Sequence, residues 1–322
     1  MGWLQKTFAA CALAIAAASG YAQTPPYPVR PIRLIVPNAP AGLADISARI
    51  VAARLTEALG QQVIVDNRPG AGSTIGTAMA VKATPDGYTL LAVFDSHATN
   101  PHLFKTLEYD TLTDLAPIAL LVRGPLLLAV SAKSGMRSVQ DMIRLAKAKP
   151  RALNFATVGP GSPARLLMEL LKLEGQIEVT NVPYKGAGLA VTDLASGQVE
   201  AMFATVPTLS PYVKTGWLHA IAITSAQRSP AVPGVPTLSE TFPRFTAESW
   251  VGMLAPAKTP RAIVVQLNAA LVKVLAQPEM KTRFAELGYE TVGSTPAQFD
   301  QWIRAETERW GKIIRTQKIA LE

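Results

Sequence analysis

Cysteine is almost absent from this sequence: the only one among 322 residues is Cys11. It lies in an alanine-rich apolar run over residues 7–20, which follows a short, positively charged start. Small residues, Gly20 and Ala22, occupy the two positions that a signal peptidase reads. The pattern predicts a secretory signal peptide over residues 1–22, cleaved after Ala22. The remaining chain would hold no disulfide and no thiolate nucleophile, and its expected location is the periplasm.

Long apolar runs and one-sided charge are also lacking. Beyond the leader, no stretch approaches the roughly 18 unbroken apolar residues of a membrane-spanning helix. The 31 basic and 23 acidic residues give a net charge of +8, which the loss of Lys6 with the leader lowers by one. The basic residues are scattered and not interleaved with aromatic residues, which argues against nucleic acid as a partner. About 300 remaining residues are enough for roughly two domains.

Motifs for catalysis and metal binding are missing. The three histidines, His97, His102 and His219, are too dispersed for a metal site. One of the first two is expected to face a cleft and the other the surface. The turn Gly70–Gly76 resembles a dinucleotide-binding loop, but its last spacing is one residue too long, and no acid is expected at the end of a third strand. We expect no metal, cofactor or catalytic residue; an exported hydrolase remains the alternative.

The sequence does contain a regular alternation of strands and helices. Short continuous apolar runs, typical of strands covered on both faces, predict strands at 32–36, 63–66, 89–94, 153–157, 180–184, 201–206, 219–225 and 250–255. Helical spacing and capping residues predict helices at 43–59, 73–83, 138–148, 162–174, 187–196, 261–276 and 296–316. Such alternation predicts an α/β fold with open, mostly parallel sheets.

Two extended passages predict how these elements divide into domains. Residues 115–130 form a long apolar segment interrupted by Arg123-Gly124-Pro125, and residues 245–260 end in a proline-rich stretch before a helix. If both passages cross between domains, residues 23–120 plus 250–322 form domain 1, and residues 121–249 form domain 2. Two crossover strands would leave a cleft with a hinge at its back.

Four turns between predicted strands and helices carry small or hydroxylated residues, at 37–42, 66–76, 155–165 and 182–194. Ligands of open α/β sheets bind outside the carboxyl ends of the strands, where helix N-termini present free N–H groups to anions. Such turns need small residues rather than charged ones, although plain turn geometry explains any single glycine as well. Asp45 and Arg49 are expected to form an ion pair on the helix surface. The predicted ligand-binding residues are Asn38, Pro40, Ala41, Gly42, Asp45, Gly72, Ser73, Ser96, His97, Thr157, Gly159, Gly161, Ser162, Tyr184 and Thr205.

Several motifs, taken in order, resemble one known family. They are Val36 to Arg49, Asn67 to Gly76, Pro85 to Leu90, His97 to Pro101, Tyr109-Asp110, Val182 to Gly186, Pro236-Thr237, Glu240 and Trp250. Together they resemble the periplasmic substrate-binding receptors of tripartite tricarboxylate transporters, of the TctC or Bug type. The similarity covers essentially the whole chain after the leader.

This resemblance implies a two-domain periplasmic-binding-protein fold of type II, a Venus flytrap, that closes on a carboxylate-bearing ligand. It places the ligand between Pro40–Asp45 and Gly159–Ser162. It also implies a monomer that presents its ligand to a tripartite-type membrane transporter; an orphan receptor that signals to a membrane sensor remains an alternative. The sequence departs from the family pattern at Asn38, Ala41 and Ala44, so the ligand is expected to differ from citrate.

Overall fold

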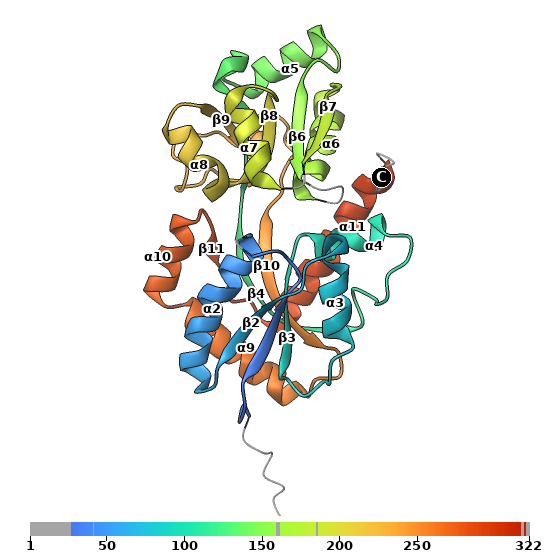
Figure 1. The fold of residues 1–322 in the computed structure, drawn as a ribbon, viewed down its shortest axis with the longest axis vertical. Coiled ribbons are helices and arrows are strands. Elements are labelled where there is room, and N and C mark those ends of the chain that lie inside the picture. The colour runs from blue at the N-terminus through green and yellow to red at the C-terminus, as the bar shows by residue number, and fades with distance from the viewer. Residues whose placement is uncertain (1–26, 41, 159–161, 185, 317–318, 320–322) are drawn as a thin grey trace, which may run out of the picture.

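The computed structural model describes residues 27–40, 42–158, 162–184, 186–316 and 319. The predicted signal peptide lies outside these residues. The described chain forms two α/β lobes, one above the other, joined by extended segments (Figure 1). Lobe 1 is the part built on a six-stranded sheet, and lobe 2 is the part built on a five-stranded sheet.

The sheet of lobe 1 has the strand order β11-β4-β10-β3-β1-β2. Its strands are β1 (Ile32–Val36), β2 (Val63–Asn67), β3 (Thr89–Phe94), β4 (Leu115–Gly124), β10 (Ser249–Pro256) and β11 (Glu290–Thr291). Strand β1 pairs in parallel with β2 and β3, whereas β10 is antiparallel to both β3 and β4. The last of the crossing strands thus inserts at the centre of this sheet.

The helices of lobe 1 cover both faces of its sheet. They are α2 (Leu43–Leu59), α3 (Thr74–Val81), α4 (Ser96–Leu103), α9 (Arg261–Leu275), α10 (Pro278–Glu286) and α11 (Pro296–Thr316). Apolar residues of α2 and α9, among them Leu55 and Leu271, share one buried cluster. Residues of α3 and α11, among them Ala80 and Phe299, share the cluster on the opposite face.

The sheet of lobe 2 has the order β7-β6-β8-β5-β9. Its strands are β5 (Leu126–Ser131), β6 (Asn154–Val158), β7 (Thr180–Tyr184), β8 (Ala201–Thr205) and β9 (Leu218–Ile223), and its helices are α5 (Val139–Ala148), α6 (Pro163–Gly175), α7 (Ala187–Ser196) and α8 (Val206–Lys214). Helices α5 and α6 pack on one face, and α7 and α8 on the other.

The expectation of mostly parallel sheets was wrong. Strand β5 is antiparallel to β8 and β9, as β10 is to its neighbours in lobe 1. The physical reason is the crossover: a strand that enters from the other lobe starts at the carboxyl ends of the resident strands, so it runs against them. The predicted domain boundaries stay a prediction, although β4 continues through residue 120 and ends at Gly124.

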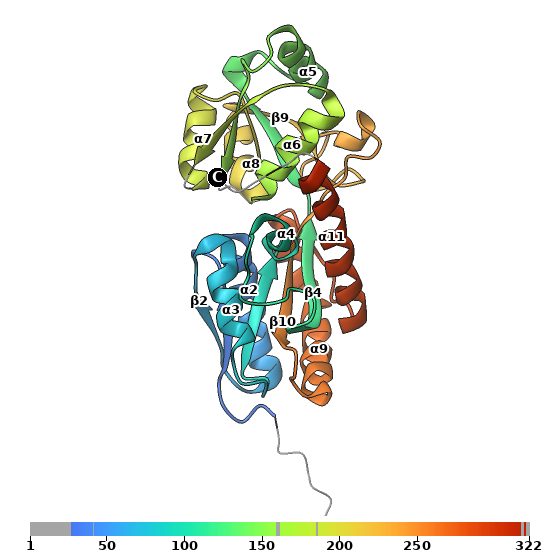
Figure 2. The ribbon, with the colours of Figure 1, turned by 90° about the vertical axis from the view of Figure 1, so that its right-hand side faces the viewer.

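The C-terminal helix α11 is attached to both lobes. Its first half packs on lobe 1 through Phe299 and Ile303. Its second half places Trp310 and Ile314 in the apolar cluster that includes Phe155 of lobe 2. Figure 2 shows this helix rising along one side of lobe 1 and reaching the lower end of lobe 2. The lobes are therefore held together by this helix as well as by the extended segments.

Candidate functional site

A cleft of about 780 Å³ lies between the lobes, at the carboxyl ends of the parallel strands. Its polar lining from lobe 1 includes Asn38, Ser73, Asp95, Ser96 and Asn100, with the glycines Gly42, Gly70 and Gly72. Lobe 2 contributes Ser162, Ala187, Thr205 and Thr208. Aromatic and aliphatic side chains, such as Phe94, Phe104 and Phe203, line the rest. Clefts of this size, with apolar walls and a few polar groups, are typical sites for small ligands.

Helix N-termini from both lobes open onto this cleft. Helix α2 starts after Gly42, α4 after Asp95, α6 after Ser162 and α8 after Thr205, and all four of these residues line the cleft. Each start offers backbone N–H groups and the positive end of a helix dipole. Among the described lining residues there is no lysine or arginine. The cleft therefore attracts anions through backbone groups rather than through cationic side chains.

Ser162 caps helix α6, as its position in the sequence predicted. Its Oγ accepts a hydrogen bond from the backbone N of Arg165 at 3.3 Å. A hydroxyl that accepts in this way still has its own proton to donate. In the neighbouring turn, the hydroxyls of Thr205 and Thr208 lie 2.8 Å apart. Both pairs put a hydroxyl at the rim of lobe 2.

The turn at residues 70–73 has an unusual backbone. Gly70, Ala71, Gly72 and Ser73 all have positive φ angles, of 136°, 44°, 61° and 83°. Such angles are unfavourable for Ala71 and Ser73, and strain of this kind persists where neighbours hold the chain in place. Here Asn100 Nδ2 donates to the carbonyl of Gly72 at 2.9 Å. The turn is thus anchored to α4.

The turn after β1 is also fixed by an amide. Asn67 Nδ2 donates to the carbonyl of Asn38 at 3.1 Å and to Asp45 Oδ1 at 2.9 Å. Asp45 is buried, pairs with Arg49 at 3.0 Å and is absent from the cleft lining. The expected surface ion pair is thus only half exposed: the Arg49 side chain is exposed, whereas the Asp45 carboxylate is buried, where it accepts the hydrogen bond from Asn67. Pro40 is exposed and lies outside the cleft lining.

Three other predicted residues, Thr157, Tyr184 and His97, are not among the described residues of the cleft lining. Thr157 donates to Asn181 Oδ1 at 2.6 Å, and the Tyr184 hydroxyl donates to Asp193 Oδ2 at 2.7 Å. Burial and the neighbouring Asp193 raise the pKa of Tyr184 to about 12. His97 is buried, and this desolvation lowers its pKa to about 4, so the ring is neutral at pH 7.

The expectation that one of two histidines faces the cleft and the other the surface was therefore wrong. Neither His97 nor His102 is among the described residues of the cleft lining. The His102 ring is half-buried, with Nε2 2.8 Å from the carbonyl oxygen of Thr307 on α11. Of the remaining predicted residues, Ala41, Gly159 and Gly161 lie outside the described residues. Asn38, Gly42, Gly72, Ser73, Ser96, Ser162 and Thr205 are brought together around the cleft.

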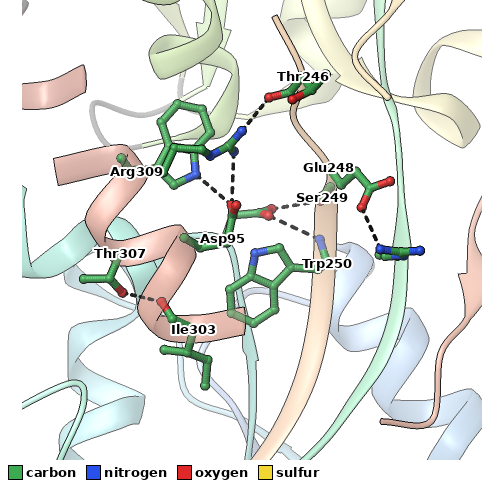
Figure 3. Close-up of polar contacts among 11 residues, drawn as sticks. Asp95, Thr246, Glu248, Ser249, Trp250, Ile303, Thr307 and Arg309 are labelled. Carbon is green, nitrogen blue, oxygen red and sulfur yellow. Dashed lines mark hydrogen bonds and ion pairs between the residues drawn. The ribbon is translucent and has the colours of Figure 1, made fainter. Parts of the chain in front are cut away.

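Sequence reasoning missed the floor of the cleft, where Asp95 and Ser249 meet (Figure 3). Asp95 Oδ2 accepts from Ser249 Oγ at 2.8 Å, and Oδ1 accepts from the backbone N of Trp250 at 3.2 Å. Desolvation by burial, with a smaller effect of Glu306, raises the pKa of Asp95 to about 7. The expectation that no acid ends the third strand was wrong, since Asp95 directly follows β3. Its carboxylate accepts two hydrogen bonds from the start of β10, and the glycine spacing still differs from that of a dinucleotide loop.

A second hollow, of about 970 Å³, is lined by Arg123, Glu248, Glu290 and Arg309 among others. Its charged groups are engaged with one another: Arg123 pairs with Glu248 and Glu290, and Arg309 pairs with Glu306. Arg123 also lies over the ring of Trp302. This hollow has few free groups for an anion, so the cleft between the helix N-termini is the better candidate site.

Two kinds of feature are not found in the described part of the chain. No described helix combines the length and apolar character needed to span a bilayer. No group of three or more His, Cys, Asp or Glu side chains lies close enough to hold a metal ion among the residues that the structure covers.

Comparison with known proteins identifies the relatives of this chain. Residues 47–319 match the family model described as "Tripartite tricarboxylate transporter family receptor". The protein BugT of Bordetella pertussis is 38% identical over 292 residues, which cover 90% of each chain. The structure of R. palustris Rpa4515 with adipate has a TM-score of 0.85 and 35% identity, covering 92% of this chain and 99% of that one.

A second solved structure, MatC from Rhodopseudomonas palustris with bound malate, has a TM-score of 0.80 and 32% identity. The match covers 89% of this chain and all of that one. The periplasmic binding protein BugD is likewise similar, with a TM-score of 0.82. The predicted resemblance and the predicted two-lobed binding-protein fold are both confirmed by these matches.

Proposed function

Because this chain belongs to the tripartite tricarboxylate transporter receptor family, we propose that its cleft captures a small carboxylate and presents it to a membrane partner. The family is one of solute-binding receptors. Two similar proteins were solved with adipate and with malate, both of which are carboxylates. The proposal extends their chemistry to the cleft of this chain.

One observation carries the proposal: the starts of helices from both lobes face a single cleft whose described lining has no lysine or arginine. A carboxylate between them accepts hydrogen bonds from both sides, so its binding favours closure of the lobes. A hydrogen bond to a charged group contributes about 1.5–3 kcal/mol. A few such bonds, less the cost of association, support micromolar affinity, near −8 kcal/mol.

The ligand-contacting groups in this proposal are the N–H groups near Gly42 and Gly72 and the hydroxyls of Ser162 and Thr205. Ala41, Gly159 and Gly161 belong to the same turns and remain proposed contacts from the sequence. The hydrolase alternative is less well supported, because Ser162 uses its oxygen as a helix cap and no histidine is among the described residues of the cleft lining.

We further propose that the protein is exported, acts in the periplasm as a monomer, and delivers its ligand to a tripartite-type transporter. The leader at residues 1–22 and the family of the chain support this. Delivery to a membrane sensor is the alternative. Deleting the transporter genes of the host should abolish uptake of the ligand in the first case and leave it unchanged in the second.

Calorimetric titration of the leaderless protein with organic acids tests the capture step. We expect at least one mono- or dicarboxylate to bind with micromolar affinity, and the corresponding amide or alcohol not to bind. A binder at a hundredfold excess over its Kd should also stabilise the fold by about 2.7 kcal/mol. Equal binding of an acid and its amide would contradict the proposal, because an uncharged group gains little from helix dipoles.

A further inference from the structure

The floor of the cleft holds a buried acid that the capture of a carboxylate does not use. Asp95 is only 7% exposed, yet it lines the cleft together with Ser249. Its two carboxylate oxygens accept hydrogen bonds from Ser249 Oγ and from the backbone N of Trp250. The side chain is thereby fixed at the point where β3 ends and β10 begins, facing a space that the proposed ligand enters.

No cation of the described chain neutralises this acid. Both donors to its carboxylate are uncharged, and the charged group that most affects it is another acid, Glu306 of α11. Tyr289, next to β11, is the other titratable group that faces it. Arg309 lies on α11 near this site (Figure 3), but it pairs with Glu306 and donates to the carbonyl of Thr246. A buried carboxylate without a cationic partner is costly.

We propose that the ligand supplies the missing cation: the cleft binds an amino acid whose ammonium group reaches Asp95 and Ser249. This inference rests on the proposed capture of a carboxylate, which would lie at the helix N-termini of both lobes. The apolar body of the ligand would pack against Phe94, Phe104 and Phe203. The helix starts would recognise the carboxylate end, and Asp95 would recognise the other end.

Proton linkage distinguishes an ammonium group from a second carboxylate next to Asp95. Burial raises the pKa of Asp95 to about 7, so a substantial fraction of the carboxyl is protonated at neutral pH. An ammonium group favours the ionised form, so binding at pH 7 should release a proton from the protein. A second carboxylate at the same place would favour the protonated form, so binding should instead take up a proton.

The experiment compares matched ligands by calorimetry at pH 7. The probes are 6-aminohexanoate with hexanoate and adipate, and leucine with 4-methylpentanoate. We expect at least one amino compound to bind about tenfold or more tightly than its deaminated partner, with proton release seen as a dependence of the heat on buffer ionisation. Asp95→Asn should abolish both the preference for the amino compound and the proton release.

Asp193→Asn is the matched control, because Asp193 pairs with the Tyr184 hydroxyl and is not among the described lining residues. It should keep the preference for the amino compound. Tighter binding of hexanoate or adipate than of the amino acids, proton uptake on binding, or an amino preference that survives in Asp95→Asn would overturn the inference. Binding of the deaminated acids alone leaves the proposed capture of a carboxylate intact; binding of no carboxylate at all overturns both.

Discussion

The two rims of the cleft present similar backbone groups but are supported in different ways. The lobe 1 rim is held from beneath by buried side chains: Asn67 and Asp45 under the first turn, and Asn100 under the turn at residues 70–73. The lobe 2 rim is held by hydroxyls in the rim itself, at Ser162 and Thr205. We therefore expect substitutions that do not contact the ligand to weaken its binding when they lie in lobe 1. In lobe 2, we expect substitutions of residues that contact the ligand to have this effect.

The largest expected effect concerns pH and two buried residues of lobe 1. The pKa of His97 is lowered from 6.5 to about 4, so its burial costs stability as pH falls from 6.5 to 4. The pKa of Asp95 is raised from 3.8 to about 7, so its burial costs stability as pH rises from 3.8 to 7. The two dependences have opposite signs, and they oppose each other in wild type.

A variant that lacks one of these two residues should therefore show the pH dependence of the unfolding free energy that the other residue causes. Relative to wild type, the unfolding free energy of Asp95→Asn should rise by about 3 kcal/mol between pH 4 and pH 6.5, and that of His97→Gln should fall by about 3 kcal/mol. Denaturant titrations at several pH values measure both. Ser162→Ala in lobe 2 is the control, because it removes no titratable group. Parallel pH profiles of the unfolding free energy for all three variants would contradict this prediction.

A smaller effect is expected from Asn67→Ala. This change removes the donor to both the Asn38 carbonyl and Asp45, and the acceptor for Arg49. We expect a loss of about 2–3 kcal/mol in unfolding free energy and weaker carboxylate binding, because the first turn loses its support. Urea denaturation and calorimetry measure the two quantities.

Asn181→Ala in lobe 2 is the counterpart of this variant, since Asn181 accepts from Thr157 away from the cleft. It should lower stability without lowering affinity. If Asn67→Ala bound ligand as tightly as wild type, the turn of lobe 1 would keep its shape without its supporting amide.

The smallest expected effect sharpens the description of lobe 2. Ser162→Ala removes a helix cap, at a cost of about 1 kcal/mol in stability, and also a hydroxyl that can donate to the ligand. We expect carboxylate affinity to fall about tenfold, which is about 1.4 kcal/mol. Ser138→Ala is the matched control, because Ser138 caps α5 in the same way but is absent from the cleft lining.

Ser138→Ala should show the loss of stability alone. A Ser162→Ala variant with a lower melting temperature but unchanged ligand affinity would show that this hydroxyl caps the helix and does not bind the ligand. Recognition at the lobe 2 rim would then depend on backbone N–H groups, which no side-chain substitution removes.

Local signals were sufficient to predict much of the fold. Helices α2, α7 and α11 have the predicted bounds, because apolar periodicity and end signals agree there. Helices α4, α8 and α10 were missed. The first two each contain a proline, Pro101 or Pro211, that argues against a helix when read locally, and α10 begins at Pro278 directly after α9. The antiparallel direction of β5 and β10 depends on where the chain crosses between lobes, which apolar runs alone do not reveal.

The candidate site was predictable where it consists of backbone. The turns near Gly42, Gly72 and Ser162 follow strands, so topology alone brings them to the cleft. Side-chain direction could not be read in the same way, and Asp45, Thr157 and Tyr184 turn to partners within their own lobes. The contact between Asp95 and Ser249 joins residues 154 positions apart, so no local pattern could have indicated it.

The central place of β10 in the lobe 1 sheet has a consequence for the order in which the molecule folds. All five strands of lobe 2 come from one continuous stretch, β5 to β9, whereas β3 and β4 of lobe 1 have no direct pairing and wait for β10 to lie between them. Contacts between distant parts of a chain form slowly, because the closure of long loops costs entropy. The strands of lobe 2 can therefore pair while the sheet of lobe 1 is still open, and the cleft cannot be complete before residues 249–256 enter that sheet.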